Sequence, residues 1–185
     1  MAITKTEAAE ALSEIERTAG RTQELRGYRT AGPILMLWGV IWVVGYVATG
    51  LLPAERWGLI WIPLDLIGFA LTILVHRKGR ADSATGAGSW RTPATALAII
   101  AFYAAVLTVF QPLAPNTYLA FPGLVVGALY GLMGIWRMTR YLWIGAAVFV
   151  LTLIGFFGFP MWLAFWMAAT GGGGLILGGL WMRRA

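Results

Sequence analysis

Six long apolar segments divide the chain and limit the folds that it can adopt. They cover residues 33–52, 57–75, 93–111, 118–136, 141–158 and 160–182. Each is close to the roughly 20 apolar residues with which an α-helix crosses a hydrocarbon core about 30 Å thick. The sequence therefore predicts an all-α polytopic membrane protein. Its six transmembrane helices would lie in residues 31–185, after an N-terminal arm over residues 1–30.

The basic residues alternate with these segments. Of the 14 Lys and Arg residues, only Arg56 lies in the first, third or fifth loop, and the rest lie in the arm, the second and fourth loops and the tail. Short loops rich in Lys and Arg stay in the cytoplasm. We therefore expect both termini to be cytoplasmic in a bacterial inner membrane, with anionic lipid headgroups near the basic helix ends.

Composition argues against several classes of function. Hydrophobic residues make up 59% of the chain and charged residues 12%, as in a membrane protein. The net charge of +6 then marks helix ends and not a nucleic-acid-binding surface. The chain has no cysteine, and His76 is its only histidine. Thiolate or histidine-built metal sites and a Ser-His-Asp triad are therefore not expected. We expect a non-enzymatic protein without a cofactor.

The arm is predicted to form an amphipathic cytoplasmic helix from Thr4 to about Arg29. Its first half is acidic and its second half basic, and it carries a narrow apolar stripe of Ala8, Leu12, Ile15 and Ala19. Gly20 and Gly27 are expected to interrupt the helix. Two interpretations stay open. The arm is either a surface helix, on the headgroups or on the protein's own cytoplasmic face, or a docking site for a partner.

The apolar segments form three hairpins of one kind. The first helix of each hairpin ends near a proline on the outer side, at Pro53, Pro112 and Pro160. Each hairpin begins and ends in the cytoplasm, so the repeats would share one orientation, unlike inverted repeats. Residues 76–91, rich in glycine and serine, would be a cytoplasmic connector.

One hairpin carries a family resemblance. It reads Leu37-Trp-Gly-Val-Ile-Trp-Val-Val-Gly-Tyr-Val-Ala-Thr-Gly-Leu-Leu-Pro53 and continues into a second helix that ends at His76-Arg77. This pattern resembles the HdeD-like acid-resistance membrane proteins, a six-helix family built from a short two-helix repeat. As architecture the resemblance covers residues 33–184, and the charged arm and the glycine block of the last helix depart from it. It implies a small bacterial inner-membrane protein linked to stress, and it carries over no catalytic residue.

Asp65 is the only ionisable side chain deep within any of the apolar segments. A carboxylate near the middle of a bilayer is costly unless it is paired or protonated, so Asp65 is a candidate site. Antiparallel pairing of the first two helices places it between Trp42 and Tyr46, whose N–H and O–H groups are potential donors. Two roles stay open: an interhelical hydrogen bond, and a proton or cation site.

The aromatic residues around this position have two interpretations of their own. Trp38, Trp42 and Tyr46 share one face of the first helix at intervals of four residues. The favoured interpretation is core packing, and the alternative is contact with a lipid, a pigment or another hydrophobic ligand.

Glycines recur at short intervals in the fourth and sixth segments. The fourth contains Gly123, Gly127 and Gly131, and the sixth contains Gly171, Gly174 and Gly178. Glycine at such spacings lets helix backbones approach closely in lipid. We expect these residues to pack helices within the chain or in a homo-oligomer. Leucine at position 127 or 174 should then disturb the packing.

Three functions remain open at this stage. The favoured one is a structural or accessory membrane protein, linked to stress or part of a larger membrane complex. The second is a small proton-coupled transporter or channel centred on Asp65. The third is a regulator that recruits a cytoplasmic partner through the arm.

Overall fold

The computed structural model describes residues 5–81, 91–136 and 138–184, and across these ranges it contains helices and turns but no strand. The elements are α1 (Lys5–Leu51), η1 (Ala54–Arg56), α2 (Trp57–Ala81), α3 (Arg91–Val109), α4 (Pro115–Trp136), α5 (Thr139–Gly158), η2 (Pro160–Trp162), α6 (Leu163–Met167), η3 (Ala168–Gly172) and α7 (Gly173–Arg183). The predicted all-α class is confirmed. Most of the predicted connector, residues 82–90, lies outside the described residues, as does Thr4.

Five helical segments in the described part of the chain are long and apolar enough to cross a membrane. They are Ala11–Leu51, Ala54–Val75, Pro115–Trp136, Thr139–Gly158 and Pro160–Arg183, and α3 adds a shorter apolar stretch, Leu97–Val109. The chain is therefore built as a helical integral membrane protein. All six predicted segments are largely helical. The first is the C-terminal part of α1, which begins at Lys5, and the other ends differ from the predicted ones by a few residues.

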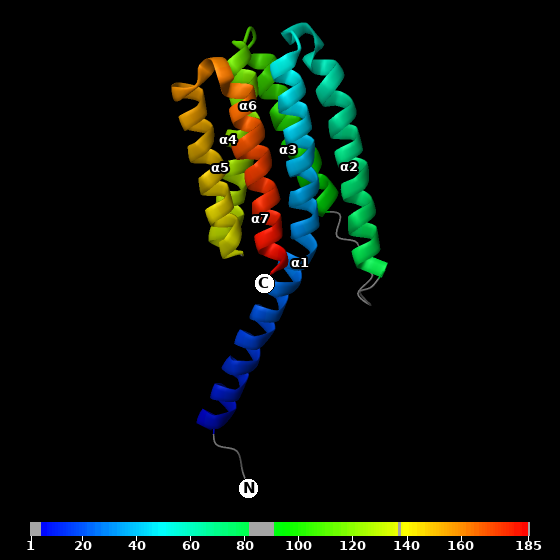
Figure 1. The fold of residues 1–185 in the computed structure, drawn as a ribbon. Coiled ribbons are helices and arrows are strands. Elements are labelled where there is room, and N and C mark those ends of the chain that lie inside the picture. Colours follow the sequence, from blue (N-terminus) through cyan, green and yellow to red (C-terminus); the bar gives the residue numbers. More distant parts are fainter. Residues whose placement is uncertain (1–4, 82–90, 137, 185) are drawn as a thin grey trace.

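Prolines mark the three turns at one end of the bundle (Figure 1). Pro53 precedes η1, Pro112 lies between α3 and α4, and Pro160 begins η2. Proline has no N–H to continue a helix, so each of the three ends the helix before it. Proline fits the first turn of a helix, and Pro160 begins η2 while Pro115 begins α4. The helices consequently run up and down, so that α2 and α4 end, and α3 and α5 begin, at the opposite end of the bundle.

Helix packing does not follow the predicted repeat. The closest pairs are α4 with α5 and α1 with α7, and both pairs join helices of different predicted hairpins. Helix α2 packs on α1. Helix α3 is the most loosely packed of the long helices that the structure describes. The three hairpins are alike in their turns but not in their packing, because contacts depend on which face of each helix carries small residues.

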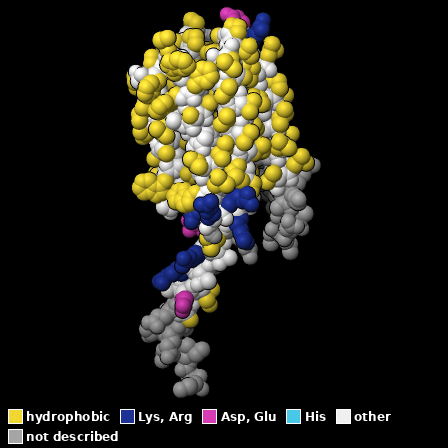
Figure 2. All heavy atoms as spheres, viewed as in Figure 1, with side chains coloured by type: hydrophobic (Ala, Val, Ile, Leu, Met, Phe, Trp, Pro, Cys, Tyr) yellow, Lys and Arg dark blue, Asp and Glu magenta, His cyan; other side chains and the backbone are white. Residues whose placement is uncertain are grey.

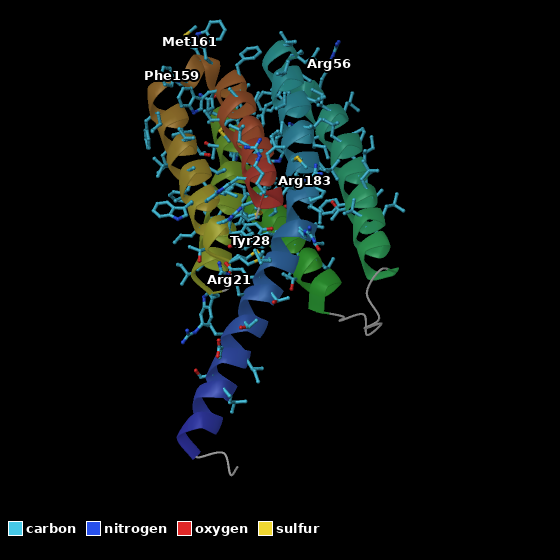
Figure 3. The ribbon with its side chains drawn as sticks, turned by 60° about the horizontal axis from the view of Figure 1, so that its bottom comes forward. Arg21, Tyr28, Arg56, Phe159, Met161 and Arg183 are labelled. Atoms are coloured by element: carbon cyan, nitrogen blue, oxygen red, sulfur yellow. The ribbon has the colours of Figure 1, made fainter. Side chains whose placement is uncertain are left out.

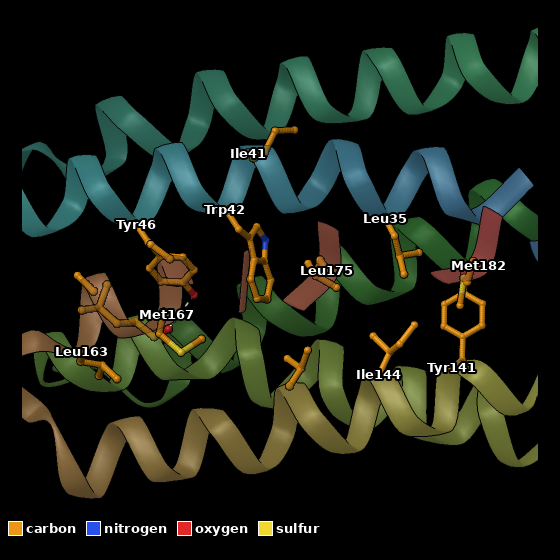
Figure 4. Close-up of a cluster of buried hydrophobic side chains, with 14 of the residues drawn as sticks. Leu35, Ile41, Trp42, Tyr46, Tyr141, Ile144, Leu163, Met167, Leu175 and Met182 are labelled. Atoms are coloured by element: carbon orange, nitrogen blue, oxygen red, sulfur yellow. Dashed lines mark hydrogen bonds between the residues drawn. The ribbon is translucent and has the colours of Figure 1, made fainter. Parts of the chain in front are cut away.

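The buried core lies between α1, α5 and the α6–η3–α7 segment (Figure 4). Its fully buried side chains include Leu35, Tyr46, Leu163, Met167 and Leu175. The outer surface of the bundle is covered with hydrophobic side chains (Figure 2). A patch of this extent is far larger than soluble monomers expose, and a bilayer is the environment that would cover it.

Helix α1 passes through Gly20, Gly27 and Pro33 without a break. The expectation that the two glycines interrupt the arm is therefore wrong. A glycine inside a helix costs about 1 kcal/mol relative to alanine, which packing elsewhere can offset. The N-terminal half of α1 projects away from the bundle along the direction of its C-terminal half (Figure 1). It does not fold back onto the bundle, so the interpretation of a helix on the protein's own face is wrong, whereas a position on the lipid headgroups stays a prediction.

Candidate functional site

Asp65 lies on the side of α2 that faces α1. This side carries Trp61, one turn before Asp65, and Gly68 and Thr72 after it. The indole N–H of Trp61 donates to Thr49 Oγ1 on α1 at 3.0 Å, and that of Trp38 on α1 donates to Thr72 Oγ1 at 3.1 Å. Two interhelical hydrogen bonds of the kind that lipid favours therefore flank Asp65 along the α1–α2 contact.

Glycines let the two tryptophan rings approach the opposite helix. A Cβ placed on Gly45 would lie 2.7 Å from the Trp61 ring, and one placed on Gly68 would lie 3.1 Å from the Trp38 ring. Each indole thus lies on a bare stretch of backbone. This arrangement explains why Trp38 is partly buried and packs on the core, as the favoured interpretation of the aromatic face required.

The predicted hydrogen bonds from Trp42 or Tyr46 to Asp65 are not formed. Tyr46 is fully buried and donates its O–H to the carbonyl of Leu119 on α4 at 2.8 Å. The Trp42 ring packs edge-on against Tyr46, 5.6 Å between centroids, and lies 3.0 Å from the Cβ position of Gly171. Both side chains point toward α4 and the last helix, so they belong to the core and the prediction of this pairing is wrong.

The Asp65 carboxyl is half-buried and close enough to two phenols to influence them electrostatically without a hydrogen bond. It interacts with Tyr46 of α1 and with Tyr103 of α3, whose ring lies 5.1 Å from that of Phe121 on α4. No described residue gives Asp65 a hydrogen bond. The described residues also contain no cluster of acidic, cysteine or histidine side chains that could hold a metal ion. Among the described residues, the arrangement offers one carboxyl group, Asp65, between α1, α2 and α3.

The predicted glycine contacts of α4 are present against α5. A Cβ on Gly127 would lie 2.8 Å from the backbone nitrogen of Phe149 and 3.0 Å from the carbonyl oxygen of Gly145. A Cβ on Gly123 would meet the side chains of Thr152 and Met167. No described atom lies within 4 Å of a Cβ on Gly131, but a Cβ on Gly145 would meet the Gly131 backbone nitrogen. The α4–α5 pair is thus held at backbone contact.

A second backbone contact joins α1 to the last helix, and its residues were not predicted. A Cβ on Gly39 would lie 2.7 Å from the carbonyl oxygen of Gly172, and one on Gly179 would lie 2.6 Å from that of Gly32. Both helices thus present glycines seven residues apart, which is close to two helical turns and one face. The matching intervals were readable in the sequence as an antiparallel pair.

Of the predicted glycines of the last helix, two make contacts and one does not. Gly171 lies against Trp42, and Gly178 lies 2.8 Å from Ile144 of α5 as measured from its Cβ position. No described atom comes within 4 Å of a Cβ on Gly174. Gly174 therefore packs no helix of the described chain, because Leu175, with 1% of its surface exposed, fills the buried position in that turn, and its predicted role in a homo-oligomer stays a prediction.

A cation–π cluster around Arg140 ties the base of the arm, at Tyr28, to the bundle. The guanidinium of Arg140, at the start of α5, lies 5.1 Å from the ring centroid of Tyr28 on α1 and 5.0 Å from that of Trp181 on α7. It also donates to the Trp181 carbonyl. The Tyr28 hydroxyl donates to Glu24 at 2.6 Å and accepts the backbone N–H of Arg140 at 3.2 Å. The sequence identified Arg140 only as a topological signal.

Comparisons with models of protein families, with curated proteins and with solved structures give no match to this chain.

Proposed function

We propose that this chain is a non-enzymatic protein of the bacterial inner membrane with six spans and both termini in the cytoplasm. At 1.5 Å per residue, the 19 residues of α3 measure about 28 Å, close to the thickness of a hydrocarbon core. The charge distribution supports the orientation. Lys and Arg gather where the arm leaves the bundle, and Arg56 lies at the opposite end (Figures 2 and 3). The HdeD-like resemblance would add a link to stress.

The function that the structure supports best is that of an accessory membrane protein that presents its arm to a cytoplasmic partner. The carrying observation is that α1 runs unbroken from Lys5 to Leu51, so one helix belongs both to the bundle and to the projecting arm. Backbone contact with the last helix and the Arg140 cluster fix α1 up to the point where it leaves the bundle. In the proposed orientation this would hold the arm away from the membrane surface.

The arm carries an apolar face that is uncovered beyond the bundle. Leu12 is 58% exposed and Ile15 is 65% exposed, and the two lie three residues apart on one side of the helix. Apart from Lys5 and Glu24, the acidic residues of the arm lie in its first half and the basic residues in its second half. The partner that fits is an amphipathic helix of a cytoplasmic protein. Its apolar stripe would cover Leu12 and Ile15, and its own charges would be opposite to those of each half of the arm.

Photo-cross-linking in intact cells tests this function. A photoreactive residue at position 12 or 15 should give the same protein adduct, and one at Ser13, exposed on another side of α1, should not. Adducts of equal yield at all three positions, adducts with lipid alone, or adducts between two copies of this chain would contradict the proposal.

The second candidate is proton or cation movement through Asp65. The observation in its favour is that Asp65 is half-buried without a hydrogen bond from any described residue, beside the loosely packed α3. Proton flux into liposomes that contain the full-length protein should then be lost in Asp65→Asn, while the folded fraction stays unchanged. Equal flux for the two proteins, or none above empty liposomes, would remove this candidate.

A further inference from the structure

An apolar groove of about 310 Å³ runs along the outer surface between α5 and α7. This volume lies at the small end of the range for ligand pockets, ~300–1,000 Å³. Small residues (Ala147, Gly174 and Gly178) leave the space, and larger ones (Trp143, Leu177 and Trp181 among them) border it. No described atom fills the side-chain position of Gly174, so the groove is open where a larger residue would close it.

One end of this groove carries a positive charge. Trp181 lines the groove, and the Arg140 guanidinium lies over its ring and donates to its carbonyl. Arg140 also lies one helical turn before Trp143 on α5. Within the described part of the chain, no carboxylate forms an ion pair with Arg140, and Glu24 accepts the Tyr28 hydroxyl. The guanidinium thus has donors left at the basic end of the bundle.

We propose that this groove binds one acidic phospholipid, with an acyl chain along the groove and the headgroup phosphate on Arg140. The apolar lining matches hydrocarbon, and the tryptophans match the level at which aromatic residues meet headgroups. Arginine binds phosphate through two parallel N–H donors, and basic sites between membrane helices on the cytoplasmic side hold anionic lipids. The inference rests on the proposed membrane orientation but not on the proposed role of the arm.

Native mass spectrometry of the full-length protein in detergent tests the site, with phosphatidylglycerol and phosphatidylcholine as the two probes. The wild type should retain phosphatidylglycerol about fivefold more tightly, the effect of one basic residue near a lipid surface. Arg140→Gln should lower phosphatidylglycerol binding to the phosphatidylcholine level. Gly174→Leu should fill the groove and weaken both lipids. Inorganic phosphate at millimolar concentration should not displace the lipid, because it has no chain to fill the groove.

Two matched controls make the test decisive. Gly173→Leu places the same side chain on the adjacent residue, where no described atom lies within 4 Å and which does not line the groove. Arg56→Gln removes a charge at the opposite end of the bundle. Both should bind like the wild type.

If Arg140→Gln does not fold, Arg140→Lys takes its place. It keeps the charge and should retain part of the preference for phosphatidylglycerol. Equal binding of both lipids by the wild type, or equal loss in Gly173→Leu and Gly174→Leu, would overturn the proposal.

Discussion

Replacing Gly39 by alanine tests the packing of α1 on the last helix most sharply. The new Cβ would lie 2.7 Å from the carbonyl oxygen of Gly172 and 2.8 Å from the backbone nitrogen of Ile176. Ordinary contacts begin at 3.4 Å, so the two backbones must separate by about 0.7 Å, the difference between 3.4 and 2.7 Å. Neither obstacle is a flexible side chain, and the neighbouring contact of Gly32 with Gly179 would loosen as well.

Overpacking of this kind costs about 1–3 kcal/mol. A chain of 150–250 residues loses roughly 2–4 °C of melting temperature for each kcal/mol, so Gly39→Ala should melt roughly 2–12 °C lower than the wild type. Thermal unfolding in detergent, followed by circular dichroism, measures the change.

Gly173→Ala is the matched control for this prediction. It adds the same methyl group on the last helix, where no described atom lies within 4 Å, and should melt at or slightly above the wild-type temperature. If Gly39→Ala and Gly173→Ala unfold at the same temperature, the argument from close backbone contact is refuted.

Three further substitutions test the polar contacts. Trp61→Phe removes the donor to Thr49 and should lower the free energy of unfolding by about 0.6 kcal/mol, the average for such bonds in membranes, when measured by unfolding in mixed micelles. Tyr28→Phe keeps the ring under Arg140 but removes the hydroxyl, so a spin label on the arm should become more mobile and stability should fall by about 0.5–1.5 kcal/mol. Asp65→Asn removes an ionisable group that has no described hydrogen bond, so its melting temperature should equal or exceed that of the wild type, and a clear fall would contradict the geometry.

The sequence alone was sufficient to predict the apolar helices and the turns that end them. Apolar length identifies a span, and Pro53, Pro112 and Pro160 end helices through local sterics, so neither depends on neighbouring helices. Charge also located the Arg140 region at the basic end. Each of these features depends on the sequence of a single segment.

Pairing between helices was predicted only in part. Gly127 does contact α5, but Gly174 faces an open groove, and the contact of Gly39 with Gly172 was missed. A stripe of small residues shows that a close approach is possible without identifying the helix that approaches. The hydrogen-bond partner of Tyr46 was ambiguous in the same way. Its hydroxyl donates to the Leu119 carbonyl, 73 residues away in the chain, and not to Asp65.

Labelling of single cysteines in intact cells tests the central claim, six spans with a cytoplasmic arm, most directly. The chain has no cysteine of its own, so every signal comes from the introduced residue. Cysteines at Glu55, Ala114 and Met161, all exposed at the turns, should react with a membrane-impermeant maleimide. Cysteines at Ser13 and Thr139 should react only after the membrane is permeabilised. Protection of Ala114→Cys together with labelling of Thr139→Cys would show that α3 does not cross, and would contradict the six-span account.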